Sequence, residues 1–271
     1  MAKLTGVGAP NRHAKGAVGD IYVNEETNEL YKCILSYRYN DSYEKEEDVT
    51  YCWKDLKTKD GGIRIEAPYL DETFDSDDNL ISASAVGYKT IRKYWFDGCT
   101  KLESVVISDG TTTIGPYAFN GCTNLTALTL PDTIDTISTY AFYKCSNLAL
   151  TQLPKSLKIV GGDAFRTCSS LALTSLPEGL TTISSYAFTG CPKLAIIRMP
   201  SSVTSIGTMA LSSCSGLTSI TFEGTPDSIA SDTFYSCNNL TVINVPWSEG
   251  AVEKAPWGAT NATINYDYTG E

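Results

Sequence analysis

Seven cysteines in this 271-residue chain follow one another at a constant interval of 23 residues. They are Cys99, Cys122, Cys145, Cys168, Cys191, Cys214 and Cys237. Self-similarity at a fixed period of roughly 20–50 residues predicts a solenoid, in which each repeat supplies one layer of a continuous core and cannot bury that layer alone. Disulfide and zinc frameworks use paired or clustered cysteines, so this spacing argues against both.

Other positions repeat in step with the cysteines. An aromatic column consists of Phe96, Phe119, Phe142, Phe165, Phe188, Leu211 and Phe234, and a leucine column of Leu102, Leu125, Leu148, Leu171, Leu194, Leu217 and Leu240. A column of alanines, Ala118, Ala141, Ala164, Ala187 and Ala210, leaves room only for a methyl group between coils. The columns therefore predict a tightly packed stack of coils.

Each repeat contains signals for two strands and a turn. The segment LTALTLP, Leu125–Pro131, predicts a strand with Leu128 and Leu130 inward and Thr129 outward, ended by a proline that cannot donate to a ladder. The segment TTIG predicts a second strand, and PYAFNGC predicts a short helical turn with Gly121 at its left-handed exit. The predicted fold is a solenoid of seven coils with parallel β-strands and short helical turns.

The repeated thiols are interpreted as packing groups. Free cysteine is among the most buried residue types, and its thiol is small and weakly polar. We predict seven buried free thiols, with no catalytic, cofactor-binding or metal-binding residue in the chain. The only histidine, His13, lies far from the cysteine column in sequence.

Four segments are expected along the chain. Residues 1–57 predict a small β-meander with strands around Ile21–Val23, Leu30–Cys33 and Val49–Leu56, in which pairing of Cys33 with Cys52 is left open. We expect a linker and N-terminal solenoid cap over residues 58–87, the repeats over residues 88–246, and a C-terminal cap over residues 247–271. In that cap Trp247 and Trp257 are expected to cover the last coil, next to one helical turn.

The linker contains DSDDN, Asp75–Asn79, for which two interpretations exist. The first is half of a calcium-binding loop. Position six of such a loop would be Leu80 instead of glycine, and position twelve Val86 instead of glutamate, which favours the second interpretation, a solvated acidic turn.

Charge and composition exclude several classes of function. The formal net charge is −10 and there is no basic stripe, so nucleic-acid binding is not expected. No apolar run reaches the roughly 18 residues of a membrane helix, and the first residues lack the apolar region of a signal peptide. No nucleophile–base arrangement and no phosphate-binding glycine loop is present, which predicts a protein without enzymatic activity or cofactor.

The pattern Ile-Gly-x-x-Ala-Phe-x-x-Cys-x-x-Leu-x-x-Leu-x-Leu-Pro, found from Ile114 to Pro131, resembles the BspA-like leucine-rich repeat of bacterial and protist surface proteins. This resemblance implies a leucine-rich-repeat solenoid and adhesion to host proteins or other cells. The sixth repeat departs from the pattern with Leu211 in place of Phe and Glu223 in place of Pro, so a different strand exit is expected there.

Two further segments resemble bacteriophage or prophage tail proteins: VGDIYVNEETNELYKC in the N-terminal part and VPWSEGAVEKAPWGATNATINYDY at the C-terminus. This resemblance implies a virion component, with residues 1–57 as a contact to other virion subunits.

The outward positions of the repeat strands are the predicted partner-binding residues: Thr129, Gln152, Ser175, Arg198, Thr221 and Asn244. A neighbouring column adds Leu150, Leu173 and Ile196. Either these three form an exposed apolar stripe, as interfaces often do, or they turn inward because Thr151 and Thr174 take the place of Leu128. Those threonines in turn are expected either to be buried or to mark a local bulge.

Three functions are therefore expected. The first is a phage tail-associated protein whose solenoid contacts a bacterial surface ligand. The second is a cell-surface adhesin that binds host or neighbour-cell proteins or glycans, and the third is a structural spacer. The corresponding locations are the virion or the extracellular surface.

Overall fold

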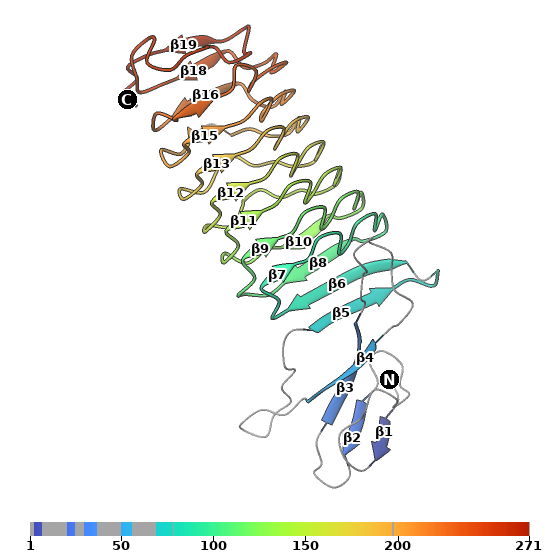
Figure 1. Ribbon diagram of the computed structural model, residues 1–271. Coiled ribbons are helices and arrows are strands. Elements are labelled where there is room, and N and C mark those ends of the chain that lie inside the picture. Colours follow the sequence, from blue (N-terminus) through green and yellow to red (C-terminus); the bar gives the residue numbers. More distant parts are fainter. Residues whose placement is uncertain are drawn as a thin grey trace. The chain divides into compact units, whose positions relative to one another are not determined.

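The computed structural model describes residues 3–6, 21–24, 30–36, 50–55, 69–77, 79–196 and 198–270 (Figure 1). The chain forms two compact units: one consists of Met1–Glu72 and Ala83–Tyr88, and the other of Thr73–Ser82 and Lys89–Glu271.

The first unit contains a four-stranded sheet in the order β1-β2-β3-β4. Its strands are β1 (Lys3–Gly6), β2 (Ile21–Asn24), β3 (Leu30–Ser36) and β4 (Thr50–Asp55). The predicted meander β2-β3-β4 is antiparallel, whereas β1 is parallel to β2. The register pairs Cys33 with Trp53 and Cys52 with Ile34, so the two cysteines are not cross-strand partners. Their side chains lie outside the described residues, as does His13.

The second unit is a stack of coils, and parallel strands pair successive coils with one another (Figure 1). One side carries a seven-stranded sheet in the order β17-β15-β13-β12-β11-β9-β7. These two-residue strands are β7 (Thr90–Ile91), β9 (Thr113–Ile114), β11 (Thr136–Ile137), β12 (Ile159–Val160), β13 (Thr182–Ile183), β15 (Ser205–Ile206) and β17 (Ser228–Ile229). Each pairs with the residues 23 positions away, which confirms the predicted repeat.

The other side carries two separate four-stranded sheets, in the orders β10-β8-β6-β5 and β14-β16-β18-β19. The first contains β5 (Tyr69–Phe74), β6 (Leu80–Val86), β8 (Ser104–Ile107) and β10 (Ala127–Thr129), and the second β14 (Arg198–Met199), β16 (Ser219–Phe222), β18 (Val242–Asn244) and β19 (Thr263–Asn265). Residues 149–153 and 172–176, which separate the two sheets, form no strand. We call this side the strand face.

The expected helical turn is wrong: the described residues contain no helix. The segment around Tyr117 is instead a chain of tight turns, which we call the arc of each coil (residues 92–98, 115–121, 138–144, 161–167 and 184–190 in the first five coils). Left-handed backbone at Tyr117 (φ 56°) and Gly121 (φ 71°) interrupts any helical run. Successive N–H groups therefore donate alternately to two kinds of carbonyl. Some donate to a carbonyl of the same coil, as Ala118 does to Gly115, and the others to a carbonyl of the next coil, as Phe119 does to Ala141 at 2.8 Å.

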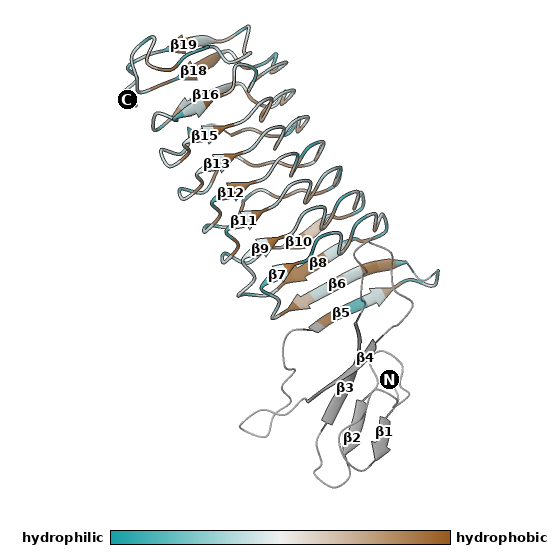
Figure 2. Ribbon diagram, in the orientation of Figure 1, coloured by the Kyte–Doolittle hydropathy of each residue, from teal (hydrophilic) through white to brown (hydrophobic). Residues whose placement is uncertain are grey.

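The core consists of the predicted columns. All seven residues of the leucine column are fully buried, and Phe96 to Phe234 are at most 1% exposed. Successive phenylalanine rings from Phe96 to Phe188 are stacked, with centroids 5.0–5.5 Å apart. The five alanines are also fully buried, which confirms the tight packing between coils. Figure 2 shows hydrophobic residues following the short strands along the stack.

Six of the seven repeat cysteines are buried and all seven are free thiols. Each buried thiol donates a hydrogen bond to a carbonyl oxygen 26 residues earlier, in the preceding arc, at 2.9–3.1 Å; Cys145, for example, donates to Phe119. The prediction of seven buried thiols is wrong for Cys99, which is half-exposed. Cys99 directly follows the first arc of the stack (residues 92–98), so no earlier arc covers it.

The C-terminal segment forms an eighth coil, and the predicted count of seven is wrong. The N–H of Phe234 donates to the carbonyl of Trp257 at 2.9 Å, so Trp257 continues the aromatic column. Trp257 is fully buried and Trp247 nearly so, and both contact the Phe222 ring, with centroids 6.1 and 5.4 Å away. The two tryptophans therefore cover the last repeat as predicted, without a helical turn.

The segment Asp75–Asn79 is an acidic turn. Asp75 accepts hydrogen bonds from the backbone N–H groups of Asp77 and Asn79, both at 2.9 Å, and the bonds from Asn79 hold the pKa of the Asp75 carboxyl below its usual range. Strand β6 begins at Leu80, which would be the sixth position of the calcium-binding loop considered above.

The turn position before each cysteine provides a stability prediction. Gly98, Gly121 and Gly190 adopt left-handed backbone there (φ 70–71°), as expected for Gly121, but Thr167 has the same conformation (φ 61°) with an exposed, β-branched side chain. We expect Thr167→Gly to raise the free energy of unfolding by about 0.5–1 kcal/mol, since relief of left-handed strain exceeds the entropy cost of glycine. Urea denaturation checks this, with Thr167→Ala as the control. A lower midpoint for the glycine variant than for the alanine variant would contradict it.

Candidate binding face

The predicted outward column lies on the strand face and reaches solvent. Thr129, Gln152, Ser175 and Arg198 are exposed, and Thr221 and Asn244 are half-exposed. The strand register aligns the last three of these residues with one another and with Asn265. The sequence therefore placed this column correctly on the surface of the solenoid.

The two halves of the column differ in their hydrogen bonding. Asn244 donates to Thr221 Oγ1 at 3.0 Å, and Asn265 donates to Asn244 Oδ1 at 2.7 Å. Arg198 forms an ion pair with Glu223. The expected change in strand exit at Glu223 is confirmed, because its N–H donates to the carbonyl of Met199, a bond that a proline at this position cannot make. The C-terminal half of the column is thus a self-bonded polar ladder.

The exposed apolar stripe is not present. Leu173 and Ile196 are fully buried and Leu150 is half-buried, whereas Thr151 and Thr174 are exposed. The second interpretation is therefore correct: leucine one position earlier takes the inward place, and two consecutive polar residues project outward. Because this shift breaks the period of two, residues 149–153 and 172–176 of coils three and four form no strand, and the strand face is interrupted there.

A groove of about 400 Å³ lies at this interruption. It is lined by Gln152, Leu153, Lys155, Ser175, Leu176, Pro177 and Glu178. Lys155 also forms an ion pair with Asp132 at 3.0 Å, and its hydrogen bonds hold the pKa of the Asp132 carboxyl below the usual range. The groove combines an apolar floor with hydroxyl, amide, ammonium and carboxylate groups, which is the mixture that fixes the orientation of a ligand in a shallow site.

A second hollow, of about 630 Å³, lies further along the same face. Arg198, Thr221 and Glu223 line it together with Asp267–Gly270. Its polar groups already bond to one another, as described above, so fewer of them are available to a ligand than in the groove at coils three and four.

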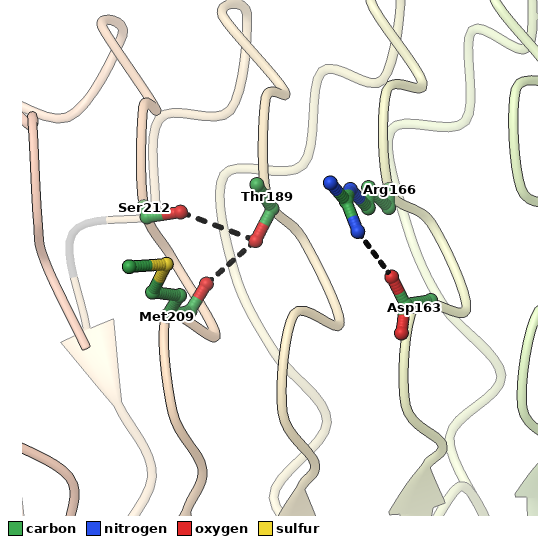
Figure 3. Close-up of polar contacts among 5 residues, drawn as sticks. All are labelled: Asp163, Arg166, Thr189, Met209 and Ser212. Carbon is green, nitrogen blue, oxygen red and sulfur yellow. Dashed lines mark hydrogen bonds and ion pairs between the residues drawn. The ribbon is translucent and has the colours of Figure 1, made fainter. Parts of the chain in front are cut away.

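Sequence reasoning missed a feature of the arcs. Tyr94, Tyr117 and Tyr140 stack on one another with ring centroids 4.9 and 4.7 Å apart, and all three are half-exposed. The signal was available, because a tyrosine precedes the alanine column (or Trp95) in four repeats. In the fourth repeat Asp163 takes its place and forms an ion pair with Arg166 at 2.9 Å (Figure 3).

Comparisons with known proteins agree with this architecture. The family model for the BspA type leucine rich repeat region matches six copies over residues 89–195 and 137–255. No curated protein matches the chain. These findings do not show the phage tail resemblance expected for the terminal segments, which stays a prediction.

Two solved structures share the fold. A leucine-rich repeat protein of T. pallidum has 27% sequence identity and a TM-score of 0.50, over 65% of this chain and 89% of the other. A leucine rich cell surface protein of Faecalibacterium prausnitzii has 22% identity and a TM-score of 0.52, over 86% of this chain and 71% of the other. Together with the repeat match over more than half of its length, the solenoid shows that the chain belongs to the BspA-type leucine-rich repeat family.

Proposed function

We propose that this protein is a non-enzymatic adhesion protein that acts at a bacterial cell surface, and that its strand face binds a protein or glycan there. The observation that carries the proposal is the interruption of the strand face at coils three and four. There Gln152 and Ser175 are exposed at the rim of a groove instead of continuing a regular ladder. The membership of the family and the description of the Faecalibacterium prausnitzii neighbour as a cell surface protein support the location.

The groove favours recognition over catalysis. The described residues contain no group of three metal-ligating side chains, and no described helix is both long and apolar enough to span a membrane. The lining offers neutral and charged hydrogen-bonding groups beside the apolar Leu153 and Leu176. A ligand with hydroxyl or amide groups and an apolar patch matches this surface, whether it belongs to a glycan or to an exposed loop of a protein.

A binding screen tests the face. The full chain would be applied to an array of bacterial and animal glycans and to immobilised extracellular-matrix proteins. For a ligand found in this way, Gln152→Ala/Ser175→Ala is expected to weaken binding about tenfold or more, since two hydrogen bonds are lost. The matched control, Thr136→Ala/Thr182→Ala, truncates two polar side chains in the seven-stranded sheet and should change affinity less than twofold. Equal losses in both variants, or no ligand in the whole screen, would overturn the proposal.

Location is tested separately by immunoblotting washed cell envelopes and prophage-induced particles of the organism that encodes the protein. A signal in the envelopes is expected. A signal confined to the particles would reject the surface adhesin in favour of the phage tail component.

A further inference from the structure

The arcs carry a second surface, distinct from the strand face. It consists of the half-exposed tyrosines Tyr94, Tyr117, Tyr140, Tyr143 and Tyr186 and the cations Arg92, Lys93, Lys144 and Arg166, which we call the arc surface. The arcs of the first five coils contain four basic residues but only two acidic ones, Asp97 and Asp163, in a chain with a net charge of −10. The arc surface is therefore locally cationic within an acidic protein.

Packing does not require tyrosine at these positions. Asp163 and Met209 occupy the same place in other coils with the same left-handed backbone (φ 54° and 49°). Left-handed backbone is unfavourable for a bulky residue, and residues held in such conformations are concentrated at functional sites. The recurrence of tyrosine at an exposed, strained position thus points to recognition by the aromatic side chains.

The cations are held against the rings. Lys93 lies 4.8 Å from the Tyr94 ring centroid, Lys144 5.0 Å from Tyr143, and Arg166 5.3 Å from Tyr186. Asp163, which is buried, also orients Arg166 through their ion pair (Figure 3). Cation–π contact limits the freedom of these long side chains, so a ligand that binds them loses less conformational entropy.

The available groups define the class of ligand. The stacked tyrosines cover one another's ring faces and the cations cover others, so these partly exposed side chains offer a ligand hydroxyl, ammonium and guanidinium groups. Donors of this kind bind carboxylate or sulfate oxygens, whereas bases would need uncovered rings. Tyr94, Tyr117 and Tyr140 recur in consecutive coils with ring centroids 4.9 and 4.7 Å apart, and the cations lie on the arcs of coils one, three and four. A row of this kind suits a regular polymer better than a folded protein.

We propose that the arc surface binds a linear acidic polysaccharide, with the chain running along the stack. This site is independent of the groove on the strand face. Carboxylate or sulfate groups would contact Lys93, Lys144 and Arg166, and sugar hydroxyls would contact the phenol groups of Tyr117 and Tyr140.

Affinity measurements at low ionic strength test this with the full chain. The probes are polygalacturonate and heparin oligosaccharides, with neutral dextran and poly-L-glutamate for comparison. At least one acidic polysaccharide should bind, dextran and poly-L-glutamate should not, and Lys93→Glu/Lys144→Glu should weaken binding more than tenfold. The control Lys155→Glu/Lys158→Glu makes the same change in charge outside the arcs and should have less than a threefold effect.

Three results would overturn the inference: no binding of either acidic polysaccharide, equal binding of poly-L-glutamate, or equal losses in both variants. Tyr117→Phe separates the tyrosine contact from folding, since it keeps the stacked ring and removes only the hydroxyl. This variant should keep the thermal stability of the parent and weaken polysaccharide binding about threefold or more, and unchanged binding would refute the role given to the phenol group.

Discussion

Raising the pH from 8 to 10 is expected to unfold this protein, because six thiols in its core resist ionisation. Burial raises the pKa of Cys145, Cys168, Cys214 and Cys237, and raises that of Cys191 to about 12. The pKa of Cys122 is raised mainly by its hydrogen bond with the Cys145 thiol and secondly by burial. In the unfolded chain a cysteine ionises near pH 8.5.

The sign of the effect follows from the number of protons bound. Below about pH 8.5 both states are protonated, and the thiols contribute their full stability. Above that pH the unfolded state loses protons that the folded state keeps, so the free energy of unfolding decreases. A thiol that stays protonated in the folded state contributes at most about 1.4 kcal/mol per pH unit, so the six together contribute at most about 8 kcal/mol per unit. A loss of this size over one pH unit is comparable with the whole free energy of unfolding of a typical domain, about 5–15 kcal/mol.

Urea denaturation between pH 7 and 10 measures this dependence, with the unfolding midpoint as the readout. The variant Cys145→Ala/Cys168→Ala/Cys191→Ala should show about half the slope above pH 9, although it is less stable at pH 7. Iodoacetamide labelling at pH 9 gives a second readout, in which the six buried thiols should react only at the rate of unfolding. A midpoint that stays constant from pH 8 to 9.5, or rapid labelling of these thiols in the native state, would contradict the expectation.

Phe142→Ala is expected to lower the free energy of unfolding by about 4–6 kcal/mol. Phe142 is fully buried, and its ring stacks between Phe119 and Phe165 with both centroid distances at 5.1 Å. Truncation leaves a cavity and removes two aromatic contacts. Because each coil contacts only its neighbours, a defect in the third coil also weakens the coupling between the two ends of the stack.

Thermal and urea unfolding, followed by both circular dichroism and tryptophan fluorescence, test this second effect. The parent chain should give coincident transitions for the repeats, whereas Phe142→Ala should separate them when both are made in a Trp53→Phe/Trp95→Phe background, in which only Trp247 and Trp257 report, on the C-terminal coils. Phe142→Leu is the matched control, because Leu211 occupies this column naturally, and it should cost about 1–2 kcal/mol without splitting the transition. A loss below 2 kcal/mol for the alanine variant would show that the column is not continuous.

The sequence predicted the core well because a strict period places equivalent residues in equivalent environments. The phenylalanine, leucine and alanine columns could be assigned from spacing alone, and so could the surface position of Gln152. The arcs were predicted less well. Their N–H groups find partners in the next coil, a long-range bond that local propensity does not reveal, so a helical turn was expected where tight turns occur. The acceptor of each thiol, a carbonyl 26 residues earlier, was hidden for the same reason.

On the strand face, the sequence alone left two interpretations open. In coils three and four, the pattern of Leu150 and Thr151 fits two registers, and only the packing of the whole stack decides between them. Cys99 was predicted buried because its repeat looks like the others, whereas burial of a thiol depends on the coil before it. The tyrosines of the arcs were overlooked because exposed columns carry no hydrophobic period.

The bonds between arcs have a direction: each buried thiol donates backward to the preceding coil, and alternate arc N–H groups donate forward to the following one. A coil therefore presents the same complementary edges whichever repeats lie beside it. In-frame duplication or loss of one repeat within a gene would keep every bond partner, and the terminal coils would still close the stack. The length of such an array can thus change in whole-coil steps during evolution, without any compensating substitution elsewhere in the chain.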